Sequence, residues 1–246
     1  MLENNARTVF VTGSSRGIGL AIAQAFAAQG DRVVLNGCHD ALQLEAALEA
    51  LRAESPTLGL MADMSDYAQA RRAFADICAA FGPVEVLVNN AGQAHFGLFS
   101  DMAPEDWDGV LRHNLGTVLN ATHLAVPDMV RAKKGVIVNI SSIWGSAGAS
   151  CEAVYAAAKG AVNAFTRSMA QELGPSGVRV NAVACGAIAT RMNERLSPEE
   201  HSAFTEKIPL LRFGTAAEVG QCVRFLASEE AAYLTGQVVG LDGGFC

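Results

Sequence analysis

A glycine-rich turn near the beginning of the chain joins a strand-like segment to a helix-like segment. The β-branched run at 8–12 predicts a strand, and apolar residues recur at helical spacing from Ile18 onward. The junction contains Gly13, Gly17 and Gly19. Glycine lets the backbone approach a pyrophosphate closely, and the following helix presents unpaired N–H groups and a partial positive charge. The pattern predicts a dinucleotide-binding unit, although a plain tight turn before a helix has the same pattern.

Tyr155 and Lys159 are four residues apart in the segment 152–173, which has helical composition and no internal proline. Residues at this spacing lie on one face of a helix, so both side chains can act on the same ligand. A free tyrosine has a pKa of about 10, and a nearby ammonium can lower it by roughly one to three units. The pair therefore predicts a tyrosine that exchanges a proton near neutral pH.

Strand-like runs alternate with helical patterns along the whole chain, which is typical of βαβ units around a parallel sheet. Ser142 follows one such run and is expected at the carboxyl edge of the sheet, where folds of this class bind ligands. The predicted strands are Thr8–Thr12, Arg32–Leu35, Leu58–Ala62, Val84–Asn89, Val136–Ser141, Arg179–Ala182 and Gln237–Leu241.

The composition fits one domain that spans residues 1–246. Apolar residues make up 50% of the chain and charged residues 17%, which allows a large core, and no low-complexity linker divides the sequence. A net charge of −7 argues against a nucleic-acid surface. The first residues lack the features of a signal peptide and no apolar run approaches a membrane span, so we expect a cytoplasmic protein without a membrane partner. The histidine and cysteine spacings indicate no metal site.

Over almost its whole length the chain resembles the classical short-chain dehydrogenases/reductases. The matching motifs are Thr12–Gly19, Asn89–Gly92, Asn114, Ser142, Tyr155 with Lys159, and Thr235–Gly244. The resemblance implies an α/β, single-domain Rossmann fold with a doubly wound, seven-stranded parallel sheet and helices on both faces. It also implies an NAD(P)-dependent oxidoreductase that exchanges a hydride with a carbonyl carbon. Tyr155 would pass the proton to the oxygen that Ser142 holds. Lys159 would bind the nicotinamide ribose and bias Tyr155, and Asn114 would position a water in the proton relay.

The resemblance also implies the residues that bind the cofactor. They are Gly13, Ser15, Arg16, Gly17, Ile18, Gly19, Asp63, Met64, Asn90, Ala91, Gly92, Tyr155, Lys159, Gly186, Ile188 and Thr190. Gly37 stands where NAD-preferring relatives carry an aspartate, and Arg16 resembles the basic residue that holds the 2′-phosphate of NADP. Cys38 replaces a second arginine of many NADP-preferring relatives. NADPH is the expected cofactor, while Asp63 and Met64 fit a strand-terminal turn equally well.

The resemblance is greatest to the 3-oxoacyl-carrier-protein reductases, so a 3-oxoacyl thioester is the expected ketone and acyl carrier protein a candidate partner. Two positions depart from that group. Cys185 replaces a proline of the family's alanine-proline-glycine motif, which could alter cofactor affinity or loop order. The carrier-protein reductases resemble one another in two basic residues that dock the carrier. Lys133 stands at the first of these positions, and Ser176 replaces the basic residue at the second. Lys133 could equally be a solvated charge that ends a helix.

Two other functions remain open. The segment 141–152 resembles the loop of reductases that act on an aminopentanone group of elongation factor P, where Glu152 could pair with the substrate amine. Glu152 could instead be a favourable acid at a helix start, and Trp144 either a pocket wall or a packing residue. A regulator that binds NADPH without turnover is the other alternative. The family commonly forms tetramers, so we expect a homotetramer.

Overall fold

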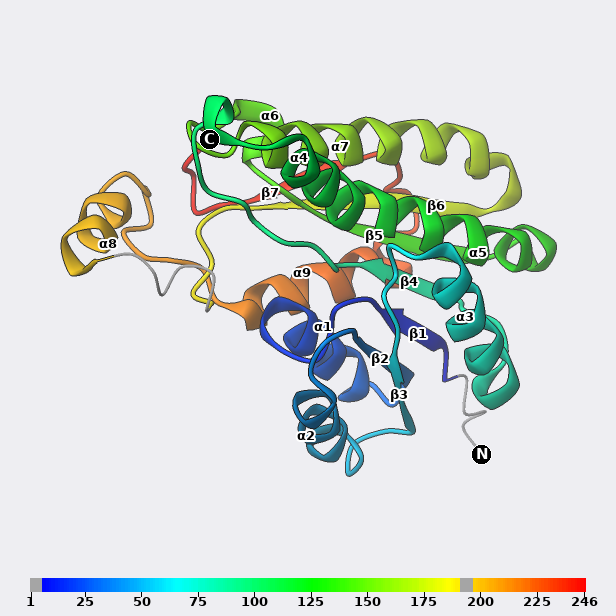
Figure 1. Ribbon diagram of the computed structural model, residues 1–246. Helices are drawn as coiled ribbons and strands as arrows, with labels where there is room; N and C mark the ends of the chain where they lie inside the picture. Colours follow the sequence, from blue (N-terminus) through cyan, green and yellow to red (C-terminus); the bar gives the residue numbers. More distant parts are fainter. Residues whose placement is uncertain (1–5, 191–196) are drawn as a thin grey trace.

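A seven-stranded parallel sheet forms the centre of the computed structural model, which describes residues 6–190 and 197–246 (Figure 1). Its strand order is β3-β2-β1-β4-β5-β6-β7, as the doubly wound prediction requires. The strands are β1 (Thr8–Val11), β2 (Arg32–Gly37), β3 (Thr57–Met61), β4 (Val86–Asn89), β5 (Gly135–Ser142), β6 (Val178–Cys185) and β7 (Val238–Leu241). The predicted sheet is confirmed. The first five residues, on which the signal-peptide expectation rests, lie outside the described part.

Helices cover both faces of the sheet (Figure 1). One layer contains α1 (Gly17–Ala27), α2 (Ala41–Leu51) and α9 (Ala216–Leu226), and the other contains α3 (Tyr67–Phe81), α5 (Thr117–Ala132) and α7 (Ala153–Leu173). Strand side chains alternate between the layers: Val9 and Val11 join the first core and Phe10 the second. The short helical segments are η1 (Phe99–Asp101), α4 (Pro104–Leu111), η2 (Arg112–Gly116), α6 (Trp144–Ala147), η3 (Gly174–Ser176), α8 (Pro198–Thr205) and η4 (Glu229–Ala231). Within the described residues, no helix is both long and apolar enough to cross a membrane.

β2 extends beyond its predicted end at Leu35. Asn36 and Gly37 are poor strand formers, so the local sequence favours an earlier end. In the fold both residues pair with β3, and the Asn36 amide donates to the carbonyls of Leu60 (3.3 Å) and Ala62 (2.9 Å). Pairing and side-chain hydrogen bonds therefore outweigh propensity, and they place Gly37 within the sheet.

β6 also extends, from its predicted end at Ala182 to Cys185. The extension is paired on both sides, with β5 and with β7. Cys185 pairs directly with Ser142, and the Ile143 N–H donates to the Cys185 carbonyl at 3.1 Å. The residue that replaces the family's proline is therefore a buried strand residue beside a predicted catalytic serine.

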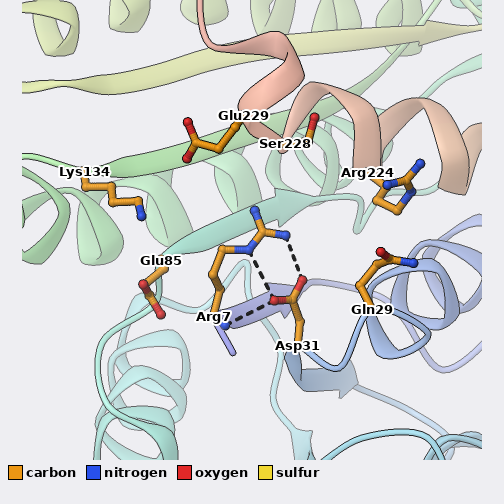
Figure 2. A pocket seen from close by; sticks show the side chains of 8 residues that line it. All are labelled: Arg7, Gln29, Asp31, Glu85, Lys134, Arg224, Ser228 and Glu229. Carbon is orange, nitrogen blue, oxygen red and sulfur yellow. Dashed lines mark hydrogen bonds and ion pairs between the residues drawn. The ribbon is translucent and has the colours of Figure 1, made fainter. Parts of the chain in front are cut away.

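Charged side chains line a depression at the amino edge of the sheet (Figure 2). Arg7, which precedes β1, lies 2.8 Å from the carboxylate of Asp31, which precedes β2, and donates to the Ala227 carbonyl at 2.6 Å. Arg179 donates to the Leu226 carbonyl at 2.6 Å. The two guanidinium groups thus satisfy carbonyls at the C-terminal end of α9. This charged depression is structural and lies at the edge opposite to the glycine turn.

Candidate active site

The glycine turn lies at the carboxyl edge of β1, where the strand order reverses between β1 and β4. Gly13 has a φ of 61°, and a Cβ on it would lie 2.9 Å from the Ala91 Cα. A Cβ on Gly19 would lie 2.4 Å from the Gly13 carbonyl oxygen. Any side chain at either position would push the two loops at the switch point apart, so the turn keeps its backbone accessible to a ligand.

Thr12 and Asn90 tie the glycine turn to the loop after β4. The Thr12 hydroxyl accepts from the N–H groups of Asn90 and Ala91, each at 3.0 Å. The Asn90 amide donates to the carbonyls of Thr12 (2.9 Å) and Gly13 (3.0 Å). The Asn90 side chain, predicted to bind cofactor, therefore shapes the cradle. Thr12 was not among the predicted site residues. The signal that could have indicated it is a threonine directly after β1, in a chain that carries an asparagine directly after β4.

The N-terminus of α1 faces this cradle. Among the described residues, its N-cap Arg16 makes no side-chain capping hydrogen bond, and the first turn contains no acid. The partial positive charge of the helix is therefore not neutralised locally. Ser15 is oriented by a 3.4 Å hydrogen bond to Gln43, while Ile18 is half-buried.

Arg16, Cys38 and Asp63 approach one another beyond the carboxyl ends of β1, β2 and β3. Burial raises the pKa of the Cys38 thiol, the Asp63 carboxylate adds to this rise, and the Arg16 guanidinium opposes it. β2 itself ends in Gly37 without an acid. The far end of the cradle thus brings the Arg16 guanidinium and the Asp63 carboxylate close to Cys38.

Asp63 and Met64 have structural roles in the free protein. One carboxylate oxygen of Asp63 accepts from the Ser65 N–H at 2.8 Å, which is the strand-terminal turn that the sequence left open. The Met64 side chain is 2% exposed and belongs to the core. The Met64 side chain is therefore not accessible to a cofactor in the free protein.

The loop after β6 is fixed at several points. The Gly186 N–H donates to the Leu241 carbonyl at 3.0 Å, and the Gly214 N–H donates to the Ala187 carbonyl at 2.9 Å. Ile188 is buried, and the Thr190 hydroxyl donates to its carbonyl at 3.4 Å. Hydrogen bonds therefore order this loop despite the missing proline, with Gly186 and Thr190 less buried than Ile188.

Ser142, Tyr155 and Lys159 meet at the carboxyl edge of β5. Ser142 is the last residue of β5 and is hydrogen-bonded to the hydroxyl of Tyr155. Lys159 is one helical turn after Tyr155 on α7; its Nζ donates to the Ile140 carbonyl at 2.9 Å and lies 5.6 Å from the centroid of the Tyr155 ring. The four-residue spacing of Tyr155 and Lys159 therefore puts both side chains on the face of α7 that meets β5.

The predicted lowering of the Tyr155 pKa is wrong for the free protein. Burial raises the pKa of Tyr155 above its ordinary value; the hydrogen bond with Ser142 opposes this rise, and the Glu152 carboxylate adds to it. Burial also lowers the pKa of Lys159 to about 8. The ammonium lies over the tyrosine ring and donates to a backbone carbonyl. Desolvation is the largest cause of the pKa shift of both groups.

Asn114 lies in η2, a π-helical turn between α4 and α5, and is completely buried. Its amide nitrogen donates to the carbonyls of Gln93 (2.8 Å) and Val110 (2.9 Å), whereas its Oδ1 atom has no hydrogen-bond partner among the described residues. A Cβ added to Gly92 would lie 2.6 Å from Asn114 Oδ1 and 3.5 Å from Lys159 Nζ. The two polar atoms therefore border the same small space, which the backbone of Gly92 leaves open.

Trp144 follows Ser142 by two residues, and Glu152 precedes Tyr155 by three. The Trp144 N–H donates to the Ser142 hydroxyl at 3.2 Å, which links the start of α6 to the predicted catalytic serine. Glu152 is the N-cap residue of α7, but its side chain makes no capping hydrogen bond within the described structure. Its charge instead acts on Tyr155.

Three aromatic residues that the sequence did not single out lie beside Trp144 or connect to it. The Phe245 ring contacts Trp144 at a centroid distance of 5.8 Å and stacks on Phe204 of α8 at 5.2 Å, and Phe204 contacts Phe213 at 5.7 Å. The start of α8 could have been predicted from the sequence, because Ser197 and Glu200 have the spacing of a capping box and form one. No local pattern indicates that Phe245 reaches Trp144.

The chain is similar to known proteins over nearly its whole length. A family model described as Enoyl-(Acyl carrier protein) reductase matches residues 13–246. The chain is 37% identical over 239 residues to 3-oxoacyl-[acyl-carrier-protein] reductase FabG of Staphylococcus aureus and 39% identical over 242 residues to that of Thermotoga maritima, and both alignments cover 97% of each chain. It is 37% identical over 244 residues to the uncharacterized oxidoreductase YmfI of Bacillus subtilis, with 97% of this chain and 98% of that protein covered.

A solved structure is also similar. The crystal structure of 3-oxoacyl-[acyl-carrier protein] reductase from Brucella melitensis superposes with a TM-score of 0.93 at 35% identity, covering 99% of this chain and 92% of that one. The fold, the family match and these near full-length relatives agree, and they identify the chain as a short-chain dehydrogenase/reductase, a family of NAD(P)-dependent oxidoreductases.

Proposed function

We propose that this protein is an NADPH-dependent reductase of 3-oxoacyl thioesters, with residues 1–246 forming one cofactor-binding and catalytic domain. The observation that carries the proposal is the meeting of Tyr155, Ser142 and Lys159 at the carboxyl edge of β5, across the loop after β4 from the glycine turn. The ketone class follows from the names of the relatives, which are 3-oxoacyl-[acyl-carrier-protein] reductases.

The residues present fit a nicotinamide dinucleotide. Gly13 and Gly19 leave the backbone of the cradle open, and the N-terminus of α1 faces it without an acid in its first turn. Lys159 would hold the hydroxyls of the nicotinamide ribose. When bound, the reduced nicotinamide supplies the hydride.

The side chains of this chain would hold the ketone and move the proton. The Ser142 hydroxyl would donate a hydrogen bond to the carbonyl oxygen, and Tyr155 would give its phenolic proton to the same oxygen as negative charge develops on it. The raised pKa of Tyr155 keeps the phenol protonated at neutral pH. This protonation state suits reduction, in which the tyrosine acts as an acid.

Asn114 supports a proton relay behind Tyr155. Its buried Oδ1 atom has no partner within the described chain and borders the space beside Lys159 Nζ. A buried carbonyl oxygen without a hydrogen bond is costly, and a water between the amide and the ammonium would satisfy it. We assign Asn114 to positioning that water.

NADPH is favoured by the charges at the far end of the cradle. Arg16 is exposed there, and β2 ends in Gly37 without the acid that would repel a 2′-phosphate. Asp63 lies nearby, but its carboxylate already accepts from the Ser65 N–H. The Arg16 guanidinium is therefore the group that we assign to the phosphate.

We also propose acyl carrier protein as a partner and a homotetramer as the assembly. A Cβ on Gly177 would lie 2.5 Å from the Lys133 carbonyl oxygen, so Lys133 lies beside the turn that contains Ser176, and together they would form a weak carrier-docking surface. The apolar side chains of Leu111, Leu119 and Val130 are exposed on α4 and α5, which fits pairing of subunits through these helices.

An absorbance assay of NADPH oxidation tests this function. Acetoacetyl coenzyme A should be reduced with NADPH, and kcat/KM with NADH should be about tenfold lower, the effect of one charge-assisted contact to the phosphate. Binding of NADPH without turnover of any ketone would contradict the proposal and favour the regulator.

A second candidate substrate is a ketone that carries an amine, such as the aminopentanone group on elongation factor P. The observation that favours it is the Glu152 carboxylate, which is close enough to Tyr155 to raise the pKa of the phenol. A substrate ammonium would be attracted to this carboxylate. The two candidates differ in charge, so one substitution separates them.

The Glu152→Gln substitution preserves shape and removes the charge. For an amine-bearing ketone we expect kcat/KM to fall about tenfold, whereas reduction of acetoacetyl coenzyme A should be unchanged. Steady-state kinetics of both substrates provide the measurement, with Glu105→Gln in the first turn of α4 as the control. An equal response of both substrates would exclude recognition of an amine by Glu152.

A further inference from the structure

The segment 242–246, which follows β7, is folded back by a compact set of interactions. Gly243 and Gly244 have φ values of 69° and 89°, a region that other residues rarely adopt. The Asp242 carboxylate accepts from the N–H groups of Gly244 at 2.9 Å and Cys246 at 3.2 Å. Phe245 is therefore held between two hydrogen-bonded neighbours and has a defined position.

This folded segment contacts the loop beyond α8 and the loop after β6. A Cβ on Gly243 would lie 2.8 Å from the Ile208 side chain, and the Leu210 N–H donates to the Gly243 carbonyl at 3.2 Å. A Cβ on Gly186 would lie 2.7 Å from the Asp242 Cα. Segment 242–246 thus packs between the α8 region and the loop that we assign to the cofactor.

The Phe245 ring joins α8 to Trp144, the first residue of α6. It meets Trp144 edge-on, with an interplanar angle of 84°, and stacks nearly parallel on Phe204, with an angle of 4°. Both geometries are favourable for aromatic pairs. The backbone N–H of Trp144 donates to the Ser142 hydroxyl, so this aromatic series begins at a residue whose backbone is fixed to the group that would hold the ketone oxygen.

The three rings are all partly exposed. A purely packing role would favour burial, as for Phe213 at the end of the same series, which is 9% exposed. Trp144, Phe245 and Phe204 therefore form an aromatic wall, which begins two residues after Ser142 and extends to α8.

We propose that Phe245 determines substrate specificity by completing this aromatic wall, along which the acyl chain of a 3-oxoacyl thioester lies. The inference rests on the proposed ketone reductase function and deepens it. A short acyl group would end before it reached the Phe245 ring, whereas a longer chain would bury methylene groups against it. Loss of the ring should weaken binding of long chains and spare short ones.

The test compares Phe245→Ala with the wild type on acetoacetyl and 3-oxooctanoyl coenzyme A. We expect KM for the longer substrate to rise about tenfold with kcat nearly unchanged, and little change for the shorter substrate. Phe245→Leu restores apolar bulk and should recover most of the difference. Phe225→Ala, which removes an exposed ring from α9, is the matched control.

Binding measured without turnover keeps this inference separate from the reaction. In calorimetric titrations Phe245→Ala should bind 3-hydroxyoctanoyl coenzyme A about tenfold more weakly than the wild type does. Its binding of 3-hydroxybutyryl coenzyme A should be nearly unchanged. Equal effects on both ligands, or no effect, would overturn the role of Phe245. Absence of ketone reduction by the wild type would contradict the proposed reaction, and the titration would still test the wall.

Discussion

Replacement of Tyr155 by phenylalanine should reduce kcat for ketone reduction by about 10²–10⁴-fold while leaving the Kd for NADPH nearly unchanged. The substitution removes the hydroxyl that we assign as proton donor, and general acid catalysis contributes roughly this range. The ring and its contact with Lys159, whose Nζ lies 5.6 Å from the ring centroid, would remain. Steady-state NADPH oxidation and a fluorescence titration of NADPH measure the two quantities.

Tyr233→Phe is the matched control, because this tyrosine is fully exposed and distant in sequence from the site. It should leave kcat unchanged. If Tyr155→Phe kept more than about a tenth of the wild-type kcat, another group would have to donate the proton.

Replacement of Lys159 by methionine should abolish most activity and yet stabilise the free protein at pH 7. Burial lowers the pKa of Lys159 from 10.5 to about 8, which corresponds to a cost of about 3 kcal/mol for the charged side chain in the folded state. Loss of its hydrogen bond to the Ile140 carbonyl offsets about 1 kcal/mol. The free energy of unfolding should therefore increase by about 2 kcal/mol, while kcat falls at least about 10²-fold.

The sign of the pH dependence follows from which state binds the extra proton. Between pH 8 and 10.5 the unfolded state keeps the proton of this lysine and the folded state loses it, so Lys159 contributes a rise of stability with pH in that window. Above pH 9 the buried Cys185 thiol, whose pKa burial raises to about 12, contributes a fall in both the wild type and the variant. Lys159→Met should lack this rise, whereas the exposed Lys134→Met should keep it. Urea unfolding at pH 7 and above pH 10 provides the measurement, and a variant less stable than the wild type at pH 7 would contradict the argument.

The same titration predicts how activity depends on pH. Wild-type kcat/KM for reduction should fall as pH rises through about 8, because Lys159 loses the charge that we assign to ribose binding. Tyr155 should contribute no decline in that range, since burial raises its pKa. This assignment of the alkaline decline to lysine differs from the tyrosine titration that the spacing of the two residues predicted.

Local patterns in the sequence predicted the strands, the glycine turn and the pair of Tyr155 and Lys159, whereas the family resemblance supplied most of the other candidate residues. The glycine turn required a close approach of backbone segments, and the structure shows it in the contacts of Gly13 and Gly19. The four-residue spacing of Tyr155 and Lys159 required a shared helix face. These features depend on neighbours along the chain, so a single sequence displays them.

Tertiary structure decided the strand ends, the electrostatics and the far wall of the site. β2 and β6 extend because pairing outweighs local propensity, and the Tyr155 pKa rises because its surroundings exclude water. Phe245 meets Trp144 only because the chain folds back at Asp242. Burial and contacts between distant segments arise only when the whole chain is packed, and for that reason no local pattern could predict them.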